Sequence, residues 1–162
     1  MDCALLAAPV AAIAAGRGPS TPEERKHALE YIHDFQVDPL NPKVNPEREW
    51  VLQWIIEIPD VHVHMCADLL DKLPKENKKD SSTILIAEMF AQPACRLQNS
   101  DKQDDRLVED QAGVEGALQV YEVLLNSNPK DRQPFLEDLI PKRDSGTLAQ
   151  WVKERDAAQC NK

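Results

Sequence analysis

The stretch that decides the fold is 83–97, TILIAEMFAQPACRL, an almost uninterrupted apolar run. As a helix it would be apolar on nearly all sides, through Ile84, Leu85, Ile86, Met89 and Phe90. Such a helix needs neighbours around it, so it predicts the middle of a bundle. Ser81 or Ser82 is expected to cap its start, and Pro93 to kink it near Met89.

Amphipathic helices with capping signals are predicted before this stretch. Ser20-Thr21-Pro22 opens one helix to about residue 36, and Asn45-Pro46 opens a second that Pro59 ends. Asp60 is expected to cap a third helix through Leu73. Its inner face would carry Val63, Cys66, Leu69 and Leu70.

Further helices follow the acidic loop 99–105. The longest is expected to run to about Leu125, and Gly113 and Gly116 inside it favour a close helix–helix approach. A short helix around 135–140 and a last helix with Leu148, Trp151 and Val152 complete the chain. No segment shows sustained alternation between hairpin turns. The sequence therefore predicts an all-α, compact bundle of six or seven short-to-medium helices arranged as antiparallel helical hairpins.

Length and charge limit the function. The 162 residues suit one domain, which we place at 16–162. The net charge of −9 argues against a nucleic-acid partner or an anionic membrane surface, because both require clustered positive charge. With 5 Gly, the chain has no Gly-rich phosphate loop.

The N-terminal run 4–15, ALLAAPVAAIAA, has the length of a signal-peptide core and is too short to span a bilayer. Ala12 and Ala14 supply the small residues that a signal peptidase reads. Met1-Asp2-Cys3 lacks the usual positive charge, which an N-terminally truncated start would explain. We therefore expect a signal peptide at 1–15 and export to the periplasm or medium. The alternative is a cytoplasmic protein whose Ala-rich helix docks on the core.

Four cysteines bear on the compartment. Cleavage after Ala14 would remove Cys3 and leave one bridge and one thiol at most. A Cys66–Cys160 disulfide would fasten the C-terminus, whereas Cys95 lies in an apolar run and suits a buried position. In a reducing cell all would remain thiols, and sequence alone does not fix the pairing.

The run from Gly18 to Cys160 resembles small exported bacterial helical proteins without an assigned function. Its most distinctive part is Pro46-Glu47-Arg48-Glu49-Trp50, with Trp54, Glu57 and Pro59-Asp60. The resemblance implies export and a helical fold, and it implies no activity.

A metal site is one functional hypothesis. Asp60-Val61-His62-Val63-His64 resembles the D-x-H-x-H strand of metal-dependent amidohydrolases, and His62, His64 and Cys66 would share one side of a strand. Those enzymes are larger barrels with further histidine ligands, and no histidine follows His64 here. The alternative is a pair of surface or partly buried histidines, and no cofactor is expected.

Carboxylates offer a second hypothesis. Glu109, Asp110 and Glu115 on the long helix could serve a cryptic hydrolase, although such residues usually form a solvated face. His33, beside the apolar stripe of the first helix, is expected in solvent. No nucleophile elbow, Walker loop or Cys-x-x-Cys is present. The sequence therefore favours a non-enzyme.

The remaining interpretation is an exported, non-enzymatic interaction or structural protein. Trp50, Trp54 and Trp151 would line helix grooves and anchor a protein partner, because aromatic residues dominate such contacts. The alternative is that these three residues belong to the core.

Overall fold

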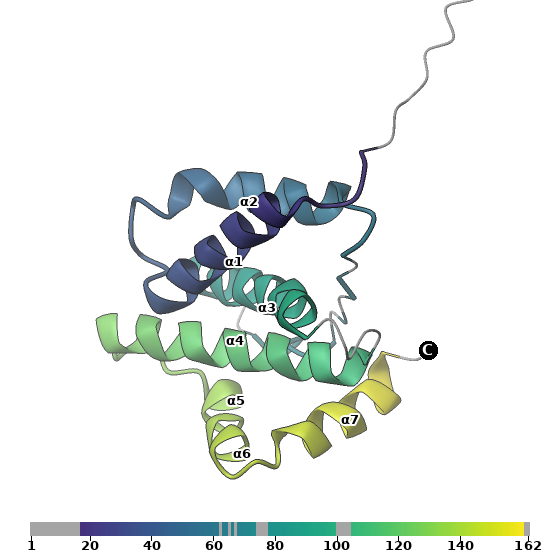
Figure 1. The fold of residues 1–162 in the computed structure, drawn as a ribbon. Helices are drawn as coiled ribbons and strands as arrows, with labels where there is room; N and C mark the ends of the chain where they lie inside the picture. The colour runs from purple at the N-terminus through teal and green to yellow at the C-terminus, as the bar shows by residue number, and fades with distance from the viewer. Residues whose placement is uncertain are drawn as a thin grey trace, which may run out of the picture.

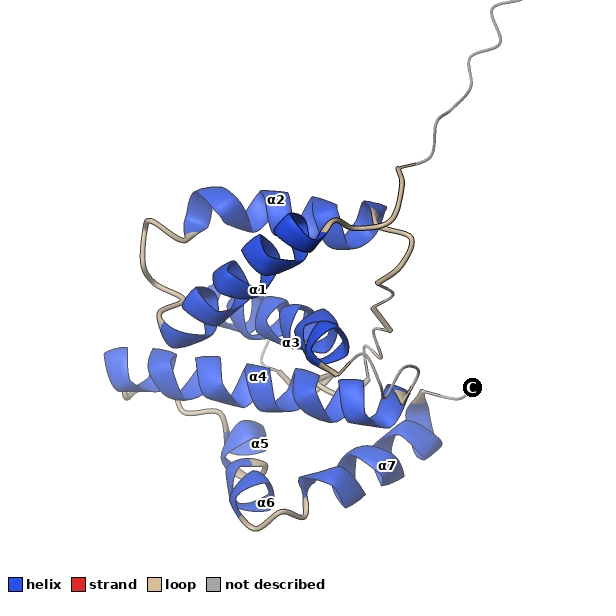
Figure 2. Ribbon diagram, viewed as in Figure 1, coloured by secondary structure: helices blue, strands red, loops and turns tan. Residues whose placement is uncertain are grey.

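The computed structural model describes residues 17–61, 63–64, 66, 68–73, 78–99 and 105–160. The predicted signal peptide, with Cys3, lies outside these residues. All regular structure in the described part is helical (Figure 2), which confirms the all-α class. The helices are α1 (Pro22–Val37), α2 (Asn45–Glu57), α3 (Lys78–Gln98), α4 (Arg106–Ser127), α5 (Pro134–Glu137), α6 (Ile140–Asp144) and α7 (Leu148–Gln159).

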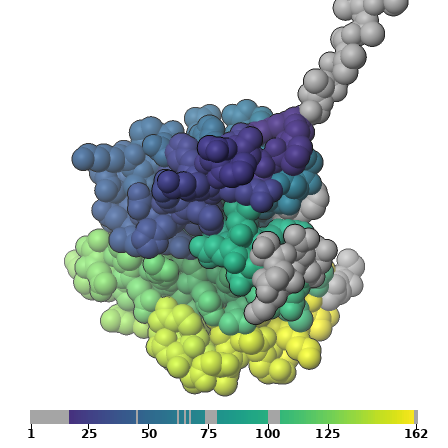
Figure 3. All heavy atoms as spheres, in the orientation of Figure 1, coloured from purple at the N-terminus to yellow at the C-terminus, as the bar shows by residue number. Residues whose placement is uncertain are grey.

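The pair α3 and α4 forms the centre of the molecule and its most extensive helix contact. It is an antiparallel hairpin, because Arg96 meets Glu109 near one end while Ala87 and Ala91 meet Gly116 further along. Helix α1 packs on both members of the pair, α2 packs on α1, and α7 packs on α4 (Figure 1). In Figure 3, α1 and α2 form one side of the body and α4 to α7 the other. Within the described residues, no helix combines the length and apolarity that crossing a membrane requires.

Side-chain caps define the starts of two helices. At α1, Thr21 Oγ1 accepts from the Glu24 backbone N–H at 3.1 Å, and the Glu24 carboxylate accepts from the Thr21 N–H at 2.9 Å. This reciprocal capping box satisfies two donors that a helix start leaves unpaired. At α4, Asp105 accepts from the Val108 N–H at 3.3 Å. Both starts lie where the sequence predicts them.

Two other helix starts differ from the prediction. Helix α3 begins at Lys78, so Ser81 and Ser82 lie inside it, and Thr83 Oγ1 donates back to the Lys79 carbonyl at 2.9 Å. Hydroxyls inside a helix can make this internal bond instead of capping. Helix α2 begins at Asn45 itself, and Val44 occupies the cap position without a side-chain cap hydrogen bond.

The predicted helix from Asp60 to Leu73 is wrong. The described residues of this segment form turns, bends and irregular chain, with no helix among them. The Asp60 carboxylate is used elsewhere: it accepts from the Ser20 N–H at 2.8 Å and from Arg25 at 2.7 Å. Asp60 thereby ties the entry of α1 to the end of α2. The predicted inward side chains Cys66, Leu69 and Leu70 are nevertheless buried.

The predicted close approach at the two glycines is confirmed. A Cβ at Gly116 would lie 2.6 Å from Ala91 Cβ and 3.2 Å from the Ala87 carbonyl oxygen. A Cβ at Gly113 would meet side-chain atoms of Gln92 and Glu88 at 3.2 Å. Small residues on both helices therefore let the two backbones approach where a larger side chain would separate them.

We expect Gly116→Ala to lower the free energy of unfolding by about 1–3 kcal/mol, because the added methyl overlaps Ala91 and the α3 backbone. Gly113→Ala is the matched control. Its methyl would meet side-chain atoms of Gln92 and Glu88 at 3.2 Å, a looser contact than the 2.6 Å at Gly116, so the gain in helix propensity of about 1 kcal/mol offsets more of the cost. Urea denaturation of both variants measures the difference. A Gly116→Ala variant more stable than the wild type would contradict the close approach.

Candidate functional site

The predicted metal ligands are not available as a set. Cys66 and Cys160 are joined by a disulfide, with their Cα atoms 5.6 Å apart, which agrees with the predicted pairing. A disulfide sulfur is not a thiolate, so Cys66 cannot bind a metal in this oxidised form. His64 is exposed, and His62 lies outside the described residues. Among the described residues, no group of three or more His, Cys, Asp and Glu side chains is arranged to hold a metal ion.

The disulfide belongs to an anchor that holds α7 against the body. Arg155 donates to the Asp68 carbonyl at 3.0 and 3.2 Å and pairs with the Asp71 carboxylate. The next residue of α7, Asp156, is buried and pairs with Arg106 at the start of α4. The C-terminal helix is thus fixed to two segments that are far apart in sequence.

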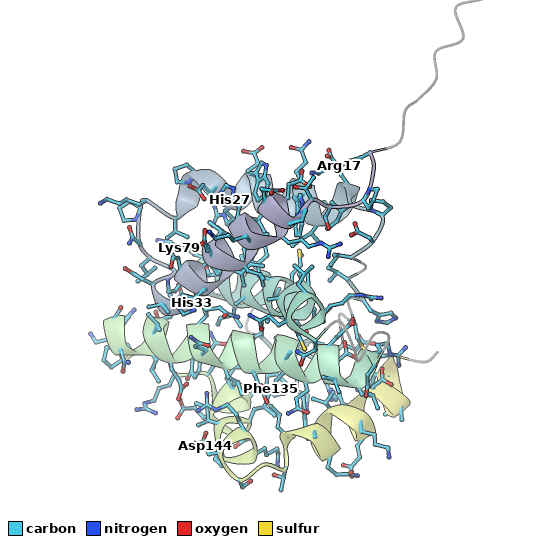
Figure 4. All side chains as sticks on the ribbon, viewed as in Figure 1. Arg17, His27, His33, Lys79, Phe135 and Asp144 are labelled. Atoms are coloured by element: carbon cyan, nitrogen blue, oxygen red, sulfur yellow. A yellow bond between two sulfur atoms is a disulfide. The ribbon has the colours of Figure 1, made fainter. Side chains whose placement is uncertain are left out.

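The predicted aromatic anchors have different environments. Trp54 is 1% exposed and belongs to the core, so a partner could not reach it in this conformation. Trp50 is half-buried, stacked on His27 with ring centroids 4.6 Å apart. Trp151 is also half-buried, and packs beside Phe135 with centroids 6.3 Å apart (Phe135 is labelled in Figure 4). Arg155 lies over the Trp151 ring.

The three predicted carboxylates of α4 are not brought together. Glu109 and Asp110 are buried against neighbouring helices, and Glu109 pairs with Arg96 at 3.5 Å. Glu115 instead lines an open groove of about 290 Å³ between α1, α3 and α4. The same groove contains the exposed His33 and the half-buried Cys95, which remains a thiol. The geometry therefore does not support a hydrolase that uses the three carboxylates jointly.

A buried polar layer between α3 and α4 is the feature that the sequence did not reveal. Glu88, Gln92 and Asp110 are at most 1% exposed. Gln92 Nε2 donates to Asp110 Oδ1 at 3.4 Å. One further oxygen of each side chain, Glu88 Oε1, Gln92 Oε1 and Asp110 Oδ2, has no hydrogen-bond partner among the described residues. The missing Cβ of Gly113 makes room for Glu88 and Gln92.

Burial raises the pKa of both carboxyl groups in this layer. The pKa of Glu88 rises to about 8, first because the charged form loses its hydration and second because Asp110 is negative. The pKa of Asp110 rises to about 6, mainly through burial; the nearby Asp156 and Glu109 add to the rise, and the interactions with His64 and Arg106 oppose it. Glu88 is therefore predominantly protonated at neutral pH. The sequence signal for this layer was the pair Glu88 and Gln92, two polar residues four positions apart within the apolar run 83–97. The apolar residues around them dominate the pattern, so the run was interpreted as apolar on nearly all sides.

Comparison of the chain with protein-family models, with curated proteins and with solved structures finds no match. The site must therefore be interpreted from its own geometry.

The buried layer makes stability depend on pH. A carboxyl group whose folded pKa is raised favours the folded state most below its unfolded pKa, and this advantage is lost as the pH rises through the folded value. Between about pH 4.5 and pH 8, the free energy of unfolding should therefore fall by an amount on the order of 3 kcal/mol through Glu88. Glu88→Gln, neutral at every pH, should lose most of this slope and be more stable than the wild type at pH 9.

Urea denaturation at a series of pH values measures this effect. Glu115→Gln, which removes a carboxylate from the open groove of the same helix pair, is the control and should keep the wild-type slope. Equal slopes for wild type and Glu88→Gln between pH 6 and pH 9 would show that Glu88 is already ionised in the folded protein.

Proposed function

We propose that this protein is a non-enzymatic helical interaction or structural protein that works in an oxidising compartment, after export to the periplasm or medium. The Cys66–Cys160 disulfide carries the proposal. Disulfides persist in exported proteins and are rare where thiols are kept reduced. The predicted signal peptide at 1–15 supports the same compartment.

The position of the Cys66–Cys160 disulfide in the fold also supports this proposal. It closes a loop across a sequence separation of 94 residues, which in the chain-entropy model contributes about 4–5 kcal/mol. Together with Arg155 and Asp156 it fixes α7 to the body. A fixed bundle of this kind presents helix faces in a constant geometry, which lowers the ordering cost of binding a partner.

The placement of the reactive side chains supports a non-enzymatic role. Glu88 and Asp110 have strongly raised pKa values, as catalytic acids often do, but they lie inside the α3–α4 contact. A substrate would have to separate the central helices to reach them. We therefore assign this layer to folding and not to catalysis.

Intact mass spectrometry of the protein expressed with its natural N-terminus, with and without thiol alkylation under denaturing conditions, tests the proposal. The expected species comes from the periplasmic fraction and is cut near Ala14 or Ala15. It should take up one alkyl group, at Cys95, until a reductant releases Cys66 and Cys160. A full-length cytoplasmic species alkylated at every cysteine without reductant would overturn both export and the bridge.

A further inference from the structure

A second groove lies on the body between α2, α3 and the α1–α2 connection. Its volume is about 710 Å³. Leu52 on α2 and Ile86 on α3 are half-buried in its walls, and Leu40 from the connection is 42% exposed. Leu85, beside Ile86, is a further exposed large apolar residue of α3. The groove therefore offers apolar surface that no described segment covers.

Two cations stand at this groove, Arg48 in the first turn of α2 and Lys79 in the first turn of α3 (Lys79 is labelled in Figure 4). Arg48 is unusual. Every other arginine in the described residues has a carboxylate within 4.0 Å, whereas Arg48 has none. Its neighbour Glu47 is engaged with His27 on α1 at 2.9 Å. Lys79 likewise has no carboxylate partner among the described residues.

The charges point to the chemistry of a ligand. Among the described residues that line the groove, the charged side chains are Arg48 and Lys79, so the charge that faces an occupant there is positive. Both lie at helix N-termini, where the helix dipole adds to the positive potential. An occupant should therefore carry a carboxylate for Arg48 and Lys79 and apolar side chains for Leu40, Leu52 and Ile86.

The open shape of the groove favours a peptide over a small amphiphile. Arg48 and Leu52 are four residues apart on one helix, and Lys79 and Ile86 are seven apart on the other, so charge and apolar surface repeat at helical intervals. An amphipathic helix presents complementary groups at the same intervals. A groove that leaves Leu40 42% exposed does not enclose a small ligand, which normally buries most of its surface.

We propose that the groove bounded by Arg48, Leu52, Lys79, Ile86 and Leu40 docks an acidic amphipathic helical segment of a partner protein. This inference rests on the proposed function and names its surface. Acidic side chains of the segment pair with Arg48 and Lys79, and its apolar side chains cover Leu40, Leu52 and Ile86.

The test is selection from a displayed library of random peptides about three helical turns long on the purified, disulfide-bonded protein. Enriched peptides are expected to carry Asp or Glu with apolar residues three or four positions apart.

The dissociation constants of the enriched peptides are then measured by fluorescence anisotropy. Arg48→Glu/Lys79→Glu should weaken binding by about tenfold or more, because two charge contacts become repulsive. Lys130→Glu/Lys153→Glu changes the net charge equally at exposed positions outside the groove and should alter affinity less than about twofold.

Two single variants keep the test decisive if the double variant does not fold, as judged by circular dichroism. Lys79→Glu changes an exposed side chain, and Leu40→Ser changes an exposed residue of the α1–α2 connection, so neither alters the core. Each variant should weaken binding by at least about threefold. The proposal is overturned if no peptide is enriched, if enriched peptides are basic, or if these variants bind as the wild type does. Displacement of the peptide by a fatty acid, or dimerisation of the chain that Arg48→Glu abolishes, would assign the groove to another occupant. None of these results depends on the compartment, which the mass measurement decides separately.

Discussion

The structure depends on the close approach of α3 and α4 at Gly113 and Gly116. Because neither glycine has a Cβ, the backbone of α4 can approach Ala87 and Ala91 of α3, and the pair forms an antiparallel centre on which α1 and α7 pack. An apolar helix such as α3 is stable in water only when neighbours cover it on several sides. The glycines allow the first of these neighbours to come close enough to do so.

The close contact between α3 and α4 also encloses polar side chains. Glu88 and Gln92 fill the space that Gly113 leaves, and Asp110 lies beside them, so three polar side chains are enclosed with a single hydrogen bond between them. Removing water from a carboxylate without supplying a partner is costly, and the folded protein avoids much of the cost by holding the proton on Glu88. A polar layer of this kind lowers the free energy of unfolding as the pH rises.

The outer helices α7 and α2 are attached to this centre by different interactions. The disulfide and the ion pairs of Arg155 and Asp156 fix α7, whereas α2 contacts the body mainly through α1. The groove with its unpaired Arg48 lies beside this less covered helix. The molecule thus combines a rigid centre with one face whose apolar and cationic groups have no partner among the described residues.

The sequence by itself determined the helical class, the glycine approach and the starts of α1 and α4, because caps, prolines and apolar periodicity act over a few residues. The sequence favoured the Cys66–Cys160 pairing without fixing it, and the structure contains that bridge. The tertiary structure alone decided three things. Asp60 binds Ser20 and Arg25 in place of capping a helix, Glu88 is buried without a full set of partners, and Arg48 is left without a carboxylate. Each depends on groups brought together from distant parts of the chain, and local propensity carries no information about which side chains will meet there.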